Sequence, residues 1–78
     1  MRKNILLVFR AINHRTLKAR EYDKYNETEA REQYRSMNIS ALQTLFALDI
    51  IDESQYNDLY MKVWRYKPIT IDDINNLL

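Results

Sequence analysis

Hydrophobic residues recur at intervals of three and four along most of this chain, and that spacing is typical of amphipathic helices. In the first segment, the residues that share one helical face are Ile5, Val8, Phe9 and Ile12. The apolar run over residues 5–9 also fits a short buried strand, because periodicity alone does not separate the two. No partner strand is evident elsewhere, so we expect a helix over residues 3–22. A strand within residues 5–12 remains the alternative.

A second apolar stripe predicts a helix over residues 27–48. Its members are Ala30, Tyr34, Met37, Ala41, Leu45 and Leu48. Asn26 is followed three residues later by Glu29, which resembles the start of a capping box. Polar residues near Asn38 are unfavourable inside a helix, because their side chains compete for backbone hydrogen bonds, and they predict a kink or break there.

Two shorter helices are indicated by residues that cap helix N-termini. Asp52 and Gln55 have the spacing of a capping box and predict a helix over residues 53–66. Thr70 and Asp73 repeat that spacing and predict a short last helix. The single proline lies between these two helices, where it ends the earlier one.

These elements predict an all-α protein that forms a single small helical domain over residues 1–78. We expect a three-helix arrangement with a short C-terminal helix, in which the second and third helices form an antiparallel hairpin. The first helix packs across that hairpin or pairs with a second subunit. The chain has no glycine, which disfavours the tight hairpin turns of a β fold. With 46% hydrophobic and 29% charged residues, the composition is that of a globular protein.

Composition also excludes several kinds of site. The absence of cysteine excludes disulfides and thiolate metal sites, and the absence of glycine excludes a P-loop and a nucleophile elbow. His14, the single histidine, lies in a polar stretch without an evident partner, so we expect a surface residue and not a general base. The pairs Asp52-Glu53 and Asp72-Asp73 lie at predicted helix starts, where capping explains them. We therefore expect no enzyme, no metal and no cofactor.

Charge is distributed unevenly although the net charge is only +1. Residues 1–24 hold seven basic and two acidic side chains, whereas residues 25–62 hold three basic and seven acidic ones. The basic candidates for a phosphate-binding stripe are Arg10, His14, Arg15, Lys18 and Arg20. The same face also fits a solvated surface, or one that meets the acidic middle of this chain or of another subunit. A helix-turn-helix is disfavoured, because residues 52–58 would bring three carboxylates into the groove.

Nine aromatic residues, six of them tyrosine, are many for so small a core. In one interpretation they are core residues whose hydroxyls reach the surface. In the other, some form an exposed binding patch, because Tyr, Trp and Arg dominate the hot spots of interfaces. The candidates for such a patch are Tyr22, Tyr25, Tyr34, Tyr60, Trp64 and Tyr66.

Residues 42–59 carry two spaced leucines, then Asp49-Ile50-Ile51-Asp52, then an aromatic at Tyr56. This pattern resembles the SHOCT-type short helical hairpin, in which a glycine stands at the position of Asp49. The resemblance implies a helical hairpin that serves oligomerisation or docking, and it carries no catalytic residue. Aspartate tolerates a left-handed backbone angle at some cost, which we expect at Asp49.

A non-enzymatic protein-binding module is the function that these observations favour. So short a chain, rich in Asn and Ile, is similar to accessory proteins of phages or mobile elements. We expect an inhibitor that binds a host complex such as a defence nuclease. The alternatives are a small DNA-associated regulator that uses the basic first helix, and a homo-oligomerisation module. The apolar run after Arg2-Lys3 is too short for a signal peptide, so a cytoplasmic protein without membrane contact is expected.

Overall fold

The computed structural model describes residues 2–77, which form four helices and no strand. The helices are α1 (Arg2–Asp23), α2 (Thr28–Ala47), α3 (Glu53–Trp64) and α4 (Ile71–Leu77). The prediction of an all-α fold is confirmed, and residues 5–12 belong to a helix. Met1 and Leu78, at the ends of the predicted domain, lie outside the described residues.

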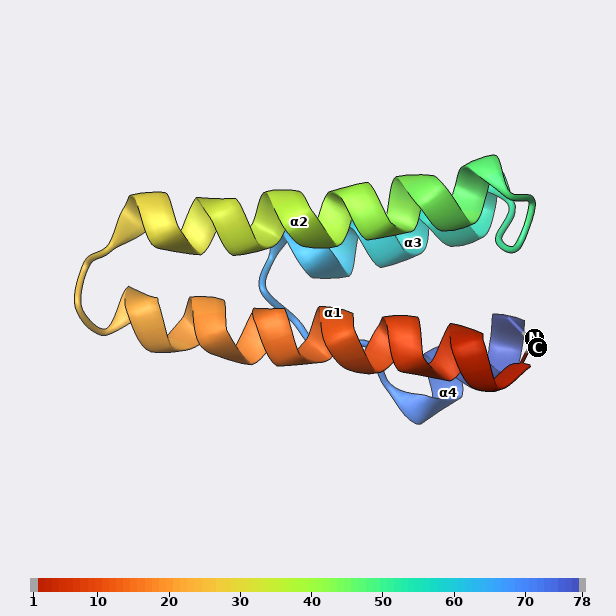
Figure 1. Cartoon of the computed structure of the whole chain (residues 1–78), viewed down its shortest axis with the longest axis horizontal. Coiled ribbons are helices and arrows are strands. Elements are labelled where there is room, and N and C mark those ends of the chain that lie inside the picture. The colour runs from red at the N-terminus through yellow and green to blue at the C-terminus, as the bar shows by residue number, and fades with distance from the viewer. Residues whose placement is uncertain (1, 78) are drawn as a thin grey trace.

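The two long helices α1 and α2 run side by side, and α3 lies against α2 (Figure 1). After α3 the chain crosses to α1, where α4 packs (Figure 1). One hydrophobic core joins all four helices, and its members are Ile5, Phe9, Ile12, Leu42, Leu45, Ile51, Leu59, Val63, Ile69 and Ile74. None of the helices that the structure describes has the length and apolarity needed to cross a membrane.

The predicted break at Asn38 is wrong, because α2 runs unbroken through this residue. Asn38 is buried against α1, where its Nδ2 donates to the Ile12 carbonyl at 3.1 Å and to the Thr16 hydroxyl at 3.3 Å. Its Oδ1 accepts from Arg15 at 3.4 Å. The side chain therefore finds its partners on a neighbouring helix and does not compete for the backbone of its own.

The capping boxes of the two shorter helices are confirmed. The Asp52 carboxylate accepts from the Gln55 backbone, and the Gln55 side chain accepts from the Asp52 backbone, both at 2.8 Å. At the start of α4, Thr70 and Asp73 make the same reciprocal contacts at 2.8 and 3.2 Å. Each box satisfies backbone donors that a helix start leaves free, and a cap of this kind stabilises by about 1 kcal/mol.

The predicted capping box at Asn26 is wrong. The N-cap of α2 is Glu27, whose side chain makes no capping hydrogen bond. Asn26 instead belongs to the end of α1, with a φ of 56°. Its N–H donates to the Asp23 carbonyl, and the Glu27 N–H donates to the Tyr22 carbonyl. This is the Schellman arrangement, in which a left-handed residue closes a helix.

The ends of α2 and α3 repeat this arrangement with residues other than glycine. Asp49 has a φ of 59°, as its place in the SHOCT-like pattern leads one to expect, and Tyr66 has a φ of 57°. Behind Asp49, the Ile50 N–H donates to the Leu45 carbonyl at 3.0 Å. A side chain in the left-handed region costs free energy that glycine would not, so each of these ends is less stable than it could be.

Replacing Asp49 by glycine is expected to stabilise the protein by about 1 kcal/mol, because the left-handed angle then carries no steric cost. For a domain of this size, that corresponds to a rise in melting temperature of about 4–8 °C. Thermal unfolding followed by circular dichroism measures the change. Asp49→Ala is the matched control and should be less stable than the parent, since alanine tolerates the angle worse than aspartate. A glycine variant that melts below the parent would contradict the argument.

Candidate functional site

Four aromatic side chains form a continuous row, which we call the aromatic strip: Phe46, Tyr56, Tyr60 and Trp64. Ring centroids are 5.4 Å apart between Phe46 and Tyr56, and 5.9 Å apart for each of the two following pairs. The three α3 residues share one face because they are spaced four apart. Phe46 is 42% and Trp64 is 46% exposed, so the strip reaches the surface.

Arg35 of α2 covers the Trp64 end of the aromatic strip, and Arg31 lies beside the neighbouring Tyr66. The guanidinium carbon of Arg35 lies 3.8 Å from the ring centroid of Trp64 and 5.3 Å from that of Tyr66. Arg35 also donates a hydrogen bond of 3.4 Å to the Trp64 carbonyl. Arg31 lies 5.3 Å from the Tyr66 ring. These cation–π contacts join α2 to the end of α3 and hold the arginines in place.

The six aromatic candidates do not form a single cluster. Tyr60 and Trp64 belong to the aromatic strip, and Tyr66 contacts the arginines beside it. Tyr22 and Tyr34 stack on each other between α1 and α2, with centroids 5.8 Å apart. The six are half-buried or exposed, and Tyr60 is the one among them that packs against the core. The remaining candidate, Tyr25, is 73% exposed in the turn after α1.

Three residues of this surface, Tyr56, Phe46 and Arg35, were not among the candidates predicted from the sequence. Tyr56 carried a signal, since its spacing from Tyr60 and Trp64 places the three on one helical face. Phe46 and Arg35 carried none, because both reach the strip from α2 and their contacts depend on how two helices pack.

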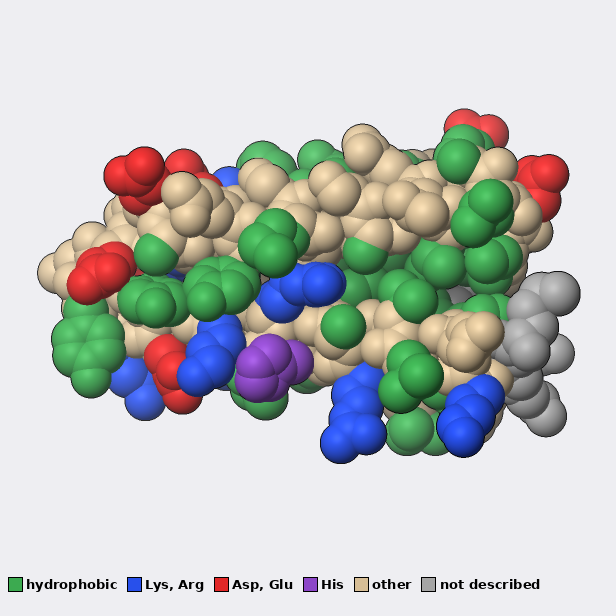
Figure 2. Space-filling view, in the orientation of Figure 1, with side chains coloured by type: hydrophobic (Ala, Val, Ile, Leu, Met, Phe, Trp, Pro, Cys, Tyr) green, Lys and Arg blue, Asp and Glu red, His purple; other side chains and the backbone are tan. Residues whose placement is uncertain are grey.

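The basic candidates on α1 are divided between the surface and the helix interface. Arg10, His14, Lys18 and Arg20 are exposed, and Figure 2 shows basic side chains along this helix with the histidine among them. Lys18 lies 3.8 Å from Glu21, which offsets part of its charge. Arg15 departs from the expected stripe, because it is half-buried and donates to Asn38.

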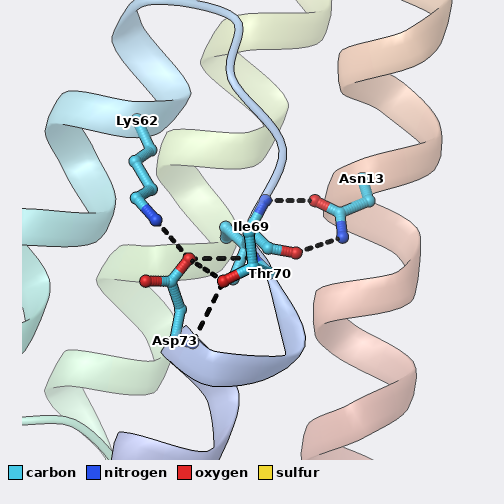
Figure 3. A network of polar contacts seen from close by, with 5 residues as sticks. All are labelled: Asn13, Lys62, Ile69, Thr70 and Asp73. Carbon is cyan, nitrogen blue, oxygen red and sulfur yellow. Dashed lines mark hydrogen bonds and ion pairs between the residues drawn. The ribbon is translucent and has the colours of Figure 1, made fainter.

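An apolar groove of about 640 Å³ lies between α1 and α4. Exposed hydrophobic side chains at its walls are Leu6, Leu17 and Ile71, and Arg10 and His14 stand among them. The groove is shaped by the way α4 is held against α1. Asn13 donates to the Ile69 carbonyl and accepts from the Ile69 N–H, both at 2.8 Å (Figure 3).

Asp73 has a structural role at this junction. Its carboxylate accepts from the Thr70 backbone and hydroxyl and pairs with Lys62 (Figure 3). Burial raises the pKa of the Asp73 carboxyl, but the hydrogen bonds from Lys62 and Thr70 and the charge of Lys62 outweigh burial and hold the pKa below its usual 3.8. Because the pKa is lowered on folding, this stabilisation is complete above the unfolded-state value and is lost as the pH falls through the folded-state value.

The described surfaces thus offer three kinds of chemistry. They are the aromatic strip with Arg35, the basic face of α1, and the apolar groove beside α4. Among residues 2–77, no three His, Asp or Glu side chains come together in a way that could hold a metal ion. Comparison of the chain with protein-family models, curated protein sequences and solved structures finds no match in any of the three.

Proposed function

We propose that this protein is a non-enzymatic protein-binding module and that the aromatic strip, together with Arg35, is its contact surface. The observation that carries the proposal is the stack of Tyr60 on Trp64, with Arg35 lying 3.8 Å above the Trp64 ring. Tyr, Trp and Arg are the residue types that contribute most to binding energy at protein interfaces.

The exposure of the strip supports a role in binding. Phe46 and Trp64 each expose more than two fifths of their surface to water. Exposed apolar surface is unfavourable, and a partner that covers it would remove this free-energy cost. The stack and the arginine contact already restrict the side chains. A partner would therefore need to order little on docking, which favours affinity.

Within this proposal, α2 and α3 act together as the antiparallel hairpin that the SHOCT resemblance implies. The strip draws on both helices, because Phe46 and Arg35 come from α2 and the other three rings from α3. The partner we propose is a host protein complex, such as a defence nuclease, that a phage or mobile element would gain from inhibiting. The Asn- and Ile-rich sequence motivates this choice.

Trp64→Ala should weaken partner binding by about thirtyfold or more, which corresponds to the ~2 kcal/mol of a typical hot spot. The partner is first captured from a bacterial lysate treated with nuclease and identified by mass spectrometry, and its affinity for each variant is then measured by calorimetry. Met61→Ala is the matched control, because Met61 is also 46% exposed on α3 but lies outside the strip. Met61→Ala should leave binding unchanged.

Other outcomes of these experiments would favour a different function. If Trp64→Ala abolished the helical circular dichroism spectrum, the ring would be a core residue. If recovery of the partner collapsed with nuclease, the DNA-associated alternative would gain, since Arg10, His14 and Lys18 are exposed on α1. Arg10→Glu combined with Lys18→Glu would then abolish binding. Recovery of the protein alone would favour homo-oligomerisation.

A further inference from the structure

A basic hollow of about 320 Å³ lies where the end of α3 meets the last turn of α1 and the first turn of α2. The residues that line it are Arg20, Asp23, Arg31, Arg65, Tyr66 and Lys67. Four of these six side chains are cationic and one is a carboxylate. Arg20 and Arg31 lie on either side of the short turn between α1 and α2, whereas Arg65 and Lys67 follow α3 much further along the chain, so the cluster is a product of the fold.

Helix dipoles explain only part of this cluster. Arg20 and Arg65 lie at the C-terminal ends of α1 and α3, where a positive charge is favourable. Arg31 lies at the opposite kind of end, near the N-terminus of α2, where the dipole disfavours a cation. Its ion pair with Asp23 uses the one carboxylate that lines the hollow. The other three cations form no ion pair with a described residue.

Two residues that line the hollow each carry a polar atom that is closed to solvent and has no hydrogen-bond partner among the described residues. These atoms are Arg31 Nε and the Tyr66 hydroxyl, and both are buried. A buried polar group without a partner costs free energy, and the few that occur in folded proteins usually have a reason. Here both atoms belong to residues that line the same basic hollow.

The backbone at Tyr66 fixes part of the lining of the hollow. Its φ of 57° is unusual for an aromatic residue, whose side chain makes the left-handed region unfavourable. The Schellman arrangement that closes α3 accounts for this angle, as it does at Asn26 and Asp49. At this position it sets the Tyr66 ring beside Arg31 and places Arg65 and Lys67 on either side of it in the chain.

We propose that this hollow binds a phosphate group. A phosphate presents several acceptor oxygens in different directions, which suits donors that arrive from three helix ends. Arginine forks match phosphate geometry in a bidentate manner, and lysine adds a compact charge. The volume lies at the lower end of the range for small-molecule sites, enough for a phosphate and part of the molecule that carries it. The hollow shares no residue with the aromatic strip but adjoins it, because the Tyr66 ring contacts both Arg31 and Arg35.

The test is a titration of the whole protein with inorganic phosphate, followed by ¹H–¹⁵N NMR of the arginine side chains. The Nε–H signal of Arg20, which is exposed and lines the hollow, should shift in a saturable manner, and a chloride titration at equal ionic strength should not reproduce the shift. Arg65→Gln and Lys67→Gln remove exposed charges at the hollow, and each should weaken binding about tenfold. Lys3→Gln is the matched control, since it removes one exposed charge from α1 outside the hollow.

Two further probes identify the source of the phosphate. Tighter binding of a nucleoside monophosphate than of a short single-stranded oligonucleotide, with both weakened by Arg65→Gln, identifies a small phosphorylated ligand. The reverse order, with the same loss in Arg65→Gln, identifies a nucleic-acid backbone. The proposal is overturned if the Arg20 signal follows ionic strength alone, or if Lys3→Gln weakens binding as much as Arg65→Gln does.

Discussion

Replacing Phe9 by alanine should cost about 3–5 kcal/mol of folding free energy, the range for removing a fully buried aromatic side chain. Phe9 is 0% exposed and belongs to the core that joins all four helices. A domain of this size has a total stability of only about 4–12 kcal/mol. The variant should therefore unfold at much lower urea concentration than the parent, as circular dichroism in a urea titration would measure.

Leu7→Ala provides the comparison for this loss. Leu7 lies on the same helix but is 51% exposed, so its truncation removes little buried surface and leaves no cavity. We expect a change of less than about 1 kcal/mol. Equal losses in the two variants would mean that α1 does not pack through the face that the structure shows, and the position of the core would have to be revised.

The helix ends that could be predicted are those whose chemistry is local. The Asp52–Gln55 and Thr70–Asp73 boxes join residues three apart, so each is visible in a few letters of sequence. Asn26 shows the limit of such reasoning. Asparagine both caps helix starts and closes helix ends. The left-handed backbone angle of Asn26 distinguishes the two roles, and residue spacing does not predict that angle.

The error at Asn38 has a different origin. Sequence reasoning weighed the competition of its side chain with the backbone of its own helix. The groups that satisfy it, the Ile12 carbonyl and the Thr16 hydroxyl, lie more than twenty residues earlier on α1. Asn38, whose residue type is unfavourable inside a helix, therefore links two helices through polar contacts. Those contacts depend on how the two helices pack.

The candidate sites show the same difference between features that are local in the sequence and features that depend on packing. The row from Tyr56 to Trp64 follows from helical spacing, but Arg35 joins it across a helix interface. The basic hollow is invisible in segment charges, because Arg31 lies within the acidic middle of the chain. The helices could be predicted from the sequence, but the pairwise contacts between them could not.

The second large effect is expected at Asn13, whose replacement by alanine should release α4 from α1. Asn13 bonds both backbone groups of Ile69, which lies 56 positions further along the chain (Figure 3). Losing both contacts at this half-buried junction should cost about 1–3 kcal/mol. With seven residues, α4 is too short to remain helical by itself. Its stability therefore depends on being docked.

Hydrogen exchange distinguishes this local release from general unfolding. In Asn13→Ala the Ile74 amide, at the buried position of α4, should exchange markedly faster, while the Leu45 amide in α2 should change far less. Asn13→Asp is the control, because a carboxylate still accepts from the Ile69 N–H but no longer donates to its carbonyl. Its effect should be intermediate. Equal acceleration at Ile74 and Leu45 would show instead that α4 and the α1–α2 pair unfold as one unit. Ile69 and Ile74 would then be as necessary to the core as Phe9.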